Sequence, residues 1–268
     1  MEDRHWSLSD IPWDRFDASL VEPAALDIIK AASLVERNAT DYVAYLCNVF
    51  ADDQAFQASI LRWGEEEEQH GEALGRWAEL ADPTFHFHER YRQFRARYQI
   101  PIDVTGSVRG SRAGEMVARC IVESGTSSFY SALRDGSREP VLRFICARIA
   151  GDEVRHYVMF HKHLQACPDN KQLGLVGRAR VAWTRLHEAD DDELAIAYHC
   201  ANMDPQPYDR GTASRAYAVR ASRFYLQKHV RGVTRMILKA VGIKPPSRVS
   251  SVLAWLAWTH LQRRWNVG

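Results

Sequence analysis

The pattern Glu-x-x-His occurs twice in this chain of 268 residues, at Glu67 and His70 and again at Glu153 and His156. Residues three apart on an α-helix lie on the same face, so each pair can direct a carboxylate and an imidazole toward one point. Both pairs lie in stretches with helical patterning. The two motifs therefore predict two helices that present matching sets of donor atoms.

A single glutamate lies upstream of each motif, inside an otherwise apolar helical pattern. Glu36 lies 31 residues before Glu67, and Glu123 lies 30 residues before Glu153. A charge among apolar neighbours is costly unless it is paired or ligated. Two glutamates from two helices, with one Glu-x-x-His from each of two others, form the ligand set of a di-metal carboxylate site in a four-helix bundle. The repeat predicts these metal ligands: Glu36, Glu67, His70, Glu123, Glu153 and His156.

The acidic run around the first motif allows a second interpretation. Glu66 lies four residues before His70 and could replace Glu67 as the ligand. The three-residue spacing that the second motif shares favours Glu67. The other acidic residues of the run are most simply a solvated helix face: Glu65, Glu68 and Glu72.

The donor types indicate which metals fit. Carboxylate oxygens and imidazole nitrogens suit iron or manganese, and the sequence has no thiolate set for structural zinc. Four carboxylates also balance the charge of two divalent ions. We therefore predict two iron ions, with an Mn/Fe pair as the alternative.

Helical patterning predicts an all-α fold in which four long helices carry the donors. Pro23 suits the first turn of the first helix, and Asp52 or Asp53 can cap the second. Residues 82–110 are expected to form the one long crossover that this ligand order requires in a bundle. The four helices are predicted at residues 23–50, 53–80, 111–133 and 139–166.

The sequence after residue 168 contains no metal-ligand motif. It is predicted to form one or two helices over 172–203, a basic helix over 212–241 and a last helix over 249–265. The chain therefore divides into an N-terminal lead-in, a bundle and a C-terminal helical extension packed on the bundle, at residues 1–22, 23–168 and 169–268. The aromatic residues of the lead-in are expected to pack along a helix: Trp6, Trp13 and Phe16.

The motifs resemble those of the soluble acyl-carrier-protein desaturases and of the wider ferritin-like di-iron family. Residues 66–71 resemble the family's Glu-Glu-x-x-His-Gly, and residues 152–156 its Asp-Glu-x-Arg-His. The segment from Glu123 to Thr126 resembles its Glu-x-x-Thr, in which the threonine lies beside the O2 site. The resemblance covers residues 25–165. It implies a ferritin-like bundle with the six ligands above, and it implies that Asp152 and Glu66 are carboxylates that hold the imidazoles.

Two departures narrow the expected activity. Ribonucleotide reductase small subunits have a radical tyrosine four residues after the first motif histidine, where this chain has Leu74. The similar N-oxygenases have an extra histidine ligand at the position of Ile149. We therefore expect an O2-dependent di-iron oxidoreductase that desaturates or hydroxylates an unactivated C–H bond of an acyl or related substrate. The alternatives are N-oxygenation of a small amine and non-enzymatic, ferritin-like iron binding.

The net charge of +1 conceals an asymmetry between the two ends of the chain. From residue 205 onward there are 12 lysines and arginines but one acidic residue, Asp209. Such a segment can dock an acidic carrier protein or an anionic substrate group, although a solvated helix face is the simpler interpretation. No base-stacking pattern accompanies it, so no nucleic-acid partner is expected.

Five scattered cysteines without a CxxC pair favour a reduced, cytoplasmic setting. No signal peptide and no membrane span are expected. The last helix, with Trp255 and Trp258, is a candidate dimer face, and the family resemblance also implies a homodimer. It further implies a small-molecule or carrier-bound acyl substrate and an external, ferredoxin-like electron donor.

Overall fold

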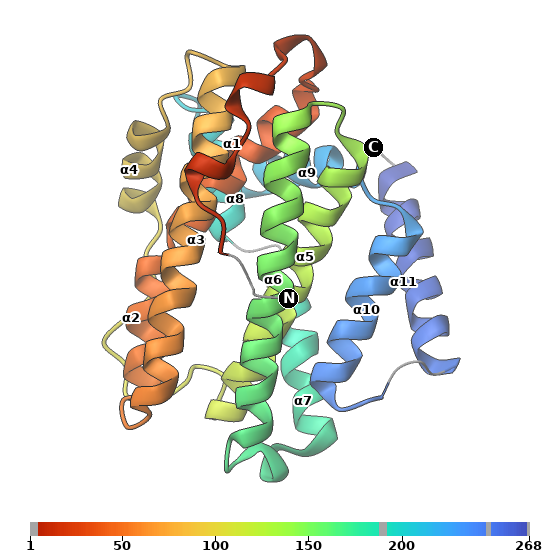
Figure 1. The fold of residues 1–268 in the computed structure, drawn as a ribbon. Coiled ribbons are helices and arrows are strands. Elements are labelled where there is room, and N and C mark those ends of the chain that lie inside the picture. The colour runs from red at the N-terminus through yellow and green to blue at the C-terminus, as the bar shows by residue number, and fades with distance from the viewer. Residues whose placement is uncertain (1–4, 188–191, 245–247, 267–268) are drawn as a thin grey trace.

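The computed structural model describes residues 5–187, 192–244 and 248–266, and within these ranges it contains helices and no strand (Figure 1). The prediction of an all-α fold is confirmed. Short 3-10 turns occupy Leu8–Asp10, Trp13–Arg15 and Ala18–Leu20. The α-helices are α1 (Pro23–Arg37), α2 (Ala39–Val49), α3 (Gln54–Ala81), α4 (Phe87–Arg97), α5 (Arg112–Gly136), α6 (Pro140–Ala166), α7 (Asn170–His187), α8 (Asp192–Asn202), α9 (Arg210–Ser222), α10 (Gln227–Val241) and α11 (Arg248–Asn266).

Side-chain caps fix the starts of the long helices. Asp53 accepts a hydrogen bond from the Phe56 amide at the start of α3. Ser111 caps α5 in the same way, and Glu139 accepts from two amides at the start of α6. Caps of this kind satisfy amides that have no partner within the helix, so these starts lie close to where the sequence predicts them.

The expected single helix over residues 23–50 is wrong, because the chain breaks at Asn38 between α1 and α2. The buried Asn38 side chain donates to Glu193 (3.2 Å) and accepts from Arg95 (2.9 Å). The backbone amide of Asn38 donates to the Val35 carbonyl, three residues back, whereas an α-helix would use the carbonyl four residues back. Asparagine competes with helical hydrogen bonding in this way, and here distant partners hold it.

The expected single basic helix over residues 212–241 is also wrong. It divides into α9 and α10, with residues 223–226 between them. Phe224 is buried against Gly136 at the end of α5, where even a Cβ atom would clash with its ring. His229 Nδ1 accepts the Leu226 amide and caps α10. Burial of one aromatic side chain therefore interrupts the helix.

The crossover between α3 and α5 packs on the bundle. It contains α4, which lies against α1, α3 and α8. Phe85, Phe87 and Phe94 from this segment are buried in the core. Apolar burial of about 1.5–3 kcal/mol per large side chain fixes the segment in place.

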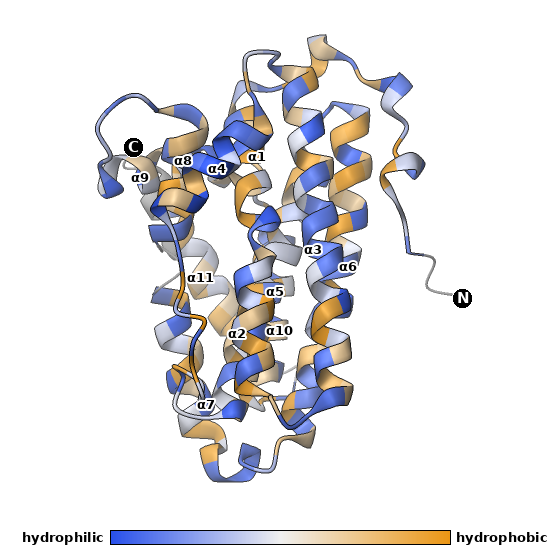
Figure 2. Ribbon diagram, turned by 90° about the vertical axis from the view of Figure 1, so that its left-hand side faces the viewer, coloured by the Kyte–Doolittle hydropathy of each residue, from blue (hydrophilic) through white to orange (hydrophobic). Residues whose placement is uncertain are grey.

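The long helices pack in two pairs, α1 with α3 and α5 with α6, and α3 also contacts α6. Gly71 allows a close approach of α1 and α3, because a Cβ there would lie 2.6 Å from the Arg37 amide nitrogen. Hydrophobic and hydrophilic residues recur along α3 and α6 (Figure 2), as expected for helices with one buried face. These pairings bring the motif residues to one place.

The helices after α6 cover the pairs from outside. α8 and α9 pack on α1, whereas α7 and α10 pack on α5, and α11 packs on α10. In the described ranges no helix has the length and apolar character needed to cross a membrane. All five cysteines are free thiols. Trp255 on α11 is 56% exposed.

Candidate metal centre

Six buried side chains from α1, α3, α5 and α6 meet in the interior. Their potential ligand atoms form two groups, and within each group all atoms lie within 4.8 Å of one another. Glu67 and Glu153 belong to both groups. The first group is completed by Glu36 and His70, and the second by Glu123 and His156. The structure thus brings together every residue that the sequence predicts as a metal ligand.

Both imidazoles direct Nδ1 at the carboxylates. His70 Nδ1 lies 3.6 Å from Glu36 Oε2, 3.5 Å from Glu67 Oε2 and 3.4 Å from Glu153 Oε1. His156 Nδ1 lies 3.1 Å from Glu67 Oε1 and 3.6 Å from Glu123 Oε2. These separations place six donors around a common interior volume.

Several of these buried atoms make no hydrogen bond within the described protein. They are Nδ1 of both histidines, both oxygens of Glu123 and Oε1 of Glu153. An unsatisfied buried polar atom costs about 1–3 kcal/mol, and more when the group is charged. So many in one place would be a large penalty for an interior that binds nothing. The donor set therefore fits a metal ion, and these buried Glu and His side chains could hold one.

The other nitrogen of each imidazole is held by a carboxylate. His70 Nε2 lies 3.0 Å from Asp152 Oδ2, and His156 Nε2 lies 2.8 Å from Glu66 Oε2. Burial opposes ionisation of Asp152, but its contact with His70 and the adjacent Arg155 charge lower its pKa. An ionised carboxylate only accepts, so Nε2–H donates, and Nδ1 is the nitrogen left facing the cluster, where it would offer its lone pair to a metal ion. Asp152 and Glu66 therefore lie where the family resemblance places them.

Trp6 contacts both His70 and Asp152, the carboxylate that holds the His70 imidazole. Its indole Nε1–H donates to Asp152 Oδ2 at 2.6 Å, and its ring is parallel to the His70 ring with centroids 6.0 Å apart. The lead-in therefore closes this side of the cluster. Packing of the lead-in aromatics along a helix is expected from the sequence, but this contact is not, because no local spacing relates Trp6 to His70.

Tyr130 makes a further contact with the cluster, and the sequence analysis does not predict it. This fully buried side chain on α5 donates its hydroxyl hydrogen to Glu36 Oε1. It lies seven residues after Glu123, which is two helical turns along the same face, and that spacing is the signal that could have found it. Leu74, the position compared with the radical tyrosine, is buried core.

Thr126 lies one turn after Glu123 on α5. Its hydroxyl donates to Glu153 Oε2, and its side chain lines a cavity beside the cluster. The structure thus places Thr126 next to the donor atoms, as the Glu-x-x-Thr resemblance implies.

Burial and neighbouring negative charges shift the pKa values of the clustered carboxylates. Burial and the neighbouring Glu67 raise the pKa of Glu36 to about 8. Burial and the Glu153 charge raise the pKa of Glu123 well above its usual range. The physical cause is four carboxylates in one volume from which water is excluded. Positive charge placed among them would relieve that cost.

A cavity of about 80 Å³ adjoins the cluster. Apolar side chains of Val35, Ala39, Trp63 and Val122 line part of it, and four of the candidate ligands line another part. The wall is completed by Thr126, Arg119, Arg185, Tyr42 and Glu193. The cavity can therefore seat a small, partly apolar molecule next to the donor atoms.

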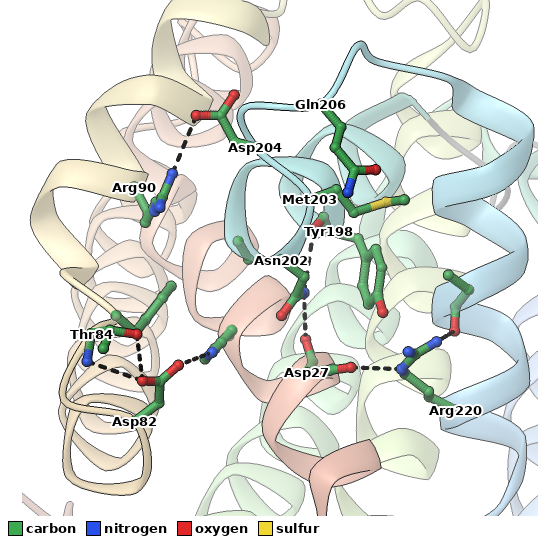
Figure 3. A pocket seen from close by; sticks show the side chains of 14 residues that line it. Asp27, Asp82, Thr84, Arg90, Tyr198, Asn202, Met203, Asp204, Gln206 and Arg220 are labelled. Carbon is green, nitrogen blue, oxygen red and sulfur yellow. Dashed lines mark hydrogen bonds and ion pairs between the residues drawn. The ribbon is translucent and has the colours of Figure 1, made fainter.

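A larger pocket of about 440 Å³ lies elsewhere, among the first part of α1, α8 and α9 (Figure 3). Its cationic side chains pair with acids in the same wall: Lys30 with Asp82, Arg90 with Asp204 and Arg220 with Asp27. Arg220 belongs to the basic C-terminal segment, so at least this charge of the segment is paired with an acid within the fold. None of the six clustered donors lines this pocket, and we assign the candidate site to the smaller cavity.

No model of a known protein family matches this chain, and no curated protein matches it in sequence.

Proposed function

We propose that this protein is a non-haem di-iron oxidoreductase of the ferritin-like superfamily, which uses O2 to desaturate or hydroxylate an unactivated C–H bond of a small acyl or related substrate. One observation carries the proposal. Two groups of four donors overlap, and they share Glu67 and Glu153. Shared carboxylates suit two ions held side by side, with one histidine and one further glutamate for each.

The donor chemistry supports iron. Two divalent ions balance four carboxylates, and oxygen donors with one imidazole per ion suit iron, or an Mn/Fe pair. When bound in the reduced state, such ions supply the electrons and open coordination positions for O2 activation. Asp152 and Glu66 orient the imidazoles, and the Thr126 hydroxyl holds one oxygen of Glu153.

The adjoining cavity supports oxidation of an organic molecule over iron storage. The apolar part of its wall, from Val35, Ala39, Trp63 and Val122, can seat carbon atoms beside the cluster. A protein that only stores iron has no need of such a cavity.

The test is anaerobic reconstitution with Fe(II), followed by metal analysis, Mössbauer spectroscopy and exposure to O2 with a panel of substrates. The expected result is two irons per chain in a coupled pair, with O2 uptake that depends on substrate and yields an alkene or alcohol. Products with an N–O bond would favour N-oxygenation instead. Substrate-independent uptake with mineral formation, or one iron per chain, would contradict the proposal.

A further inference from the structure

The cavity beside the cluster contains a buried cation whose hydrogen-bonding capacity is not used up. Arg119 on α5 is 7% exposed and lines the cavity. Its Nε makes no hydrogen bond within the described protein. The nearest acid atom is Glu115 Oε1, at 3.5 Å, and the guanidinium lies over the Tyr42 ring at 4.9 Å. A guanidinium offers five N–H donors, so capacity remains for a ligand.

Two of the acids near Arg119, Glu115 and Glu193, already accept hydrogen bonds from other donors. Glu115 accepts from Tyr45 at 2.8 Å and from Ser107 at 2.7 Å, both at Oε2. Glu193, on the cavity wall, accepts from Tyr42 and from Asn38. In the larger pocket, by contrast, cations form close pairs with acids (Figure 3). Arg119 is thus a buried positive charge with Glu115 Oε1 at 3.5 Å, and the remaining acid nearby, Glu123, has both oxygens free of hydrogen bonds in the described protein and would be engaged by a bound metal ion.

Arg119 is also placed to orient a bound molecule toward the metal ligands. It lies four residues before Glu123 on α5, a rise of about 6 Å along the helix. Both side chains line the same cavity, with apolar Val35 and Val122 in the wall. A molecule anchored at Arg119 would therefore present its carbon atoms to the cluster. The cavity volume of about 80 Å³ restricts that molecule to a short chain.

We infer that the substrate is a small organic carboxylate whose carboxylate group binds Arg119. This inference rests on the proposed function and narrows its substrate class. A guanidinium and a carboxylate form charge-assisted, often bidentate hydrogen bonds, and these are strong in a buried site. A carrier-bound acyl thioester has no such group, so the free acid is the form recognised.

The experiment is anaerobic calorimetry on the iron-loaded protein with butyrate and hexanoate, and with hexanamide as the neutral counterpart. Arg119→Gln should weaken carboxylate binding roughly tenfold or more and leave hexanamide binding unchanged. Arg119→Lys should bind the carboxylates with intermediate affinity, because a lysine keeps the charge but loses the planar fork. Arg62→Gln, an exposed change on α3, is the matched control and should leave both ligands unaffected.

Equal carboxylate affinity in the parent and in Arg119→Gln would overturn the inference, since the ligand would then be held by the metal ions or elsewhere. Failure of every carboxylate to bind the parent would overturn it too. If Arg119→Gln does not fold, Arg119→Lys decides, because unchanged affinity there excludes a bidentate contact. Carboxylate binding through Arg119 without any O2-dependent product would refute the proposed function and leave the inference intact.

Discussion

The hydroxyl of Tyr130 donates a hydrogen bond to Glu36 Oε1 and so joins two buried side chains that lie 94 residues apart in the sequence. The bond links α5 to the end of α1. It occupies one oxygen of the carboxylate, while Oε2 faces His70 Nδ1 at 3.6 Å. Tyr130 therefore fixes which oxygen of Glu36 is turned toward the cluster.

Tyr130→Phe should weaken metal binding by roughly tenfold, because partners that orient a ligand typically contribute that much to metal affinity. The measurement is metal affinity by competition with a chelator. Tyr157→Phe is the control: this buried tyrosine on α6 donates its hydroxyl hydrogen to the Met236 carbonyl. The Tyr157→Phe variant should lose about as much stability as Tyr130→Phe but keep the metal affinity of the parent. Parent-like affinity in Tyr130→Phe would show that Glu36 needs no such support.

Glu123→Ala should lose metal and remain helical. Both Glu123 oxygens are buried without hydrogen-bond partners, so their removal breaks no protein contact of this kind and relieves repulsion in the metal-free state. Metal analysis should give at most one ion per chain, and circular dichroism should be unchanged. His156→Ala should behave alike. The control is Glu65→Ala, a change of an exposed residue on the same helix as Glu67. If Glu123→Ala still bound two ions per chain, Glu123 would not be a metal ligand.

Asp152→Asn should lower metal affinity by about 10–100-fold, because a neutral amide no longer fixes the protonation of His70. Trp6→Phe removes only one donor to Asp152 and should have a smaller effect. Affinity measured alongside the melting temperature separates the two roles. A loss of melting temperature with unchanged affinity would mean that Asp152 supports only the fold.

The metal-free protein should lose stability as the pH rises. The pKa of Glu36 is raised from 4.5 to about 8, chiefly by burial and by Glu67. Between these values the folded state keeps a proton that the unfolded state has released, so raising the pH favours unfolding. The pKa of Glu123 shifts in the same direction, whereas that of Glu67 is lowered, because its contacts with His156 and His70 outweigh burial.

Melting temperatures of chelator-treated protein between pH 5 and pH 8 test this dependence. The decline should shrink in Glu36→Gln, which has no charge to titrate. Added metal should stabilise the protein more at pH 8 than at pH 5, since it displaces those protons. A melting temperature that rises with pH in the metal-free parent would contradict the assignment.

Much of the candidate site is already present in the sequence. The i,i+3 spacing of each Glu-x-x-His places two donors on one helix face whatever the helix packs against. Asp53 and Ser111 cap their helices through contacts three residues away. Such features depend on local geometry, and local geometry is encoded in short stretches of sequence.

The tertiary structure decides what depends on neighbours far along the chain. Asn38 breaks a helix because Arg95 and Glu193 hold its side chain, and Phe224 breaks another because it is buried beside Gly136. Arg119, Glu123, Thr126 and Tyr130 follow one face of α5, yet the sequence does not say that this face meets Glu36. The order of residues along each helix sets which side chains that helix presents. Packing between helices decided which of them meet, because contacts across many residues follow from the shape of the whole core.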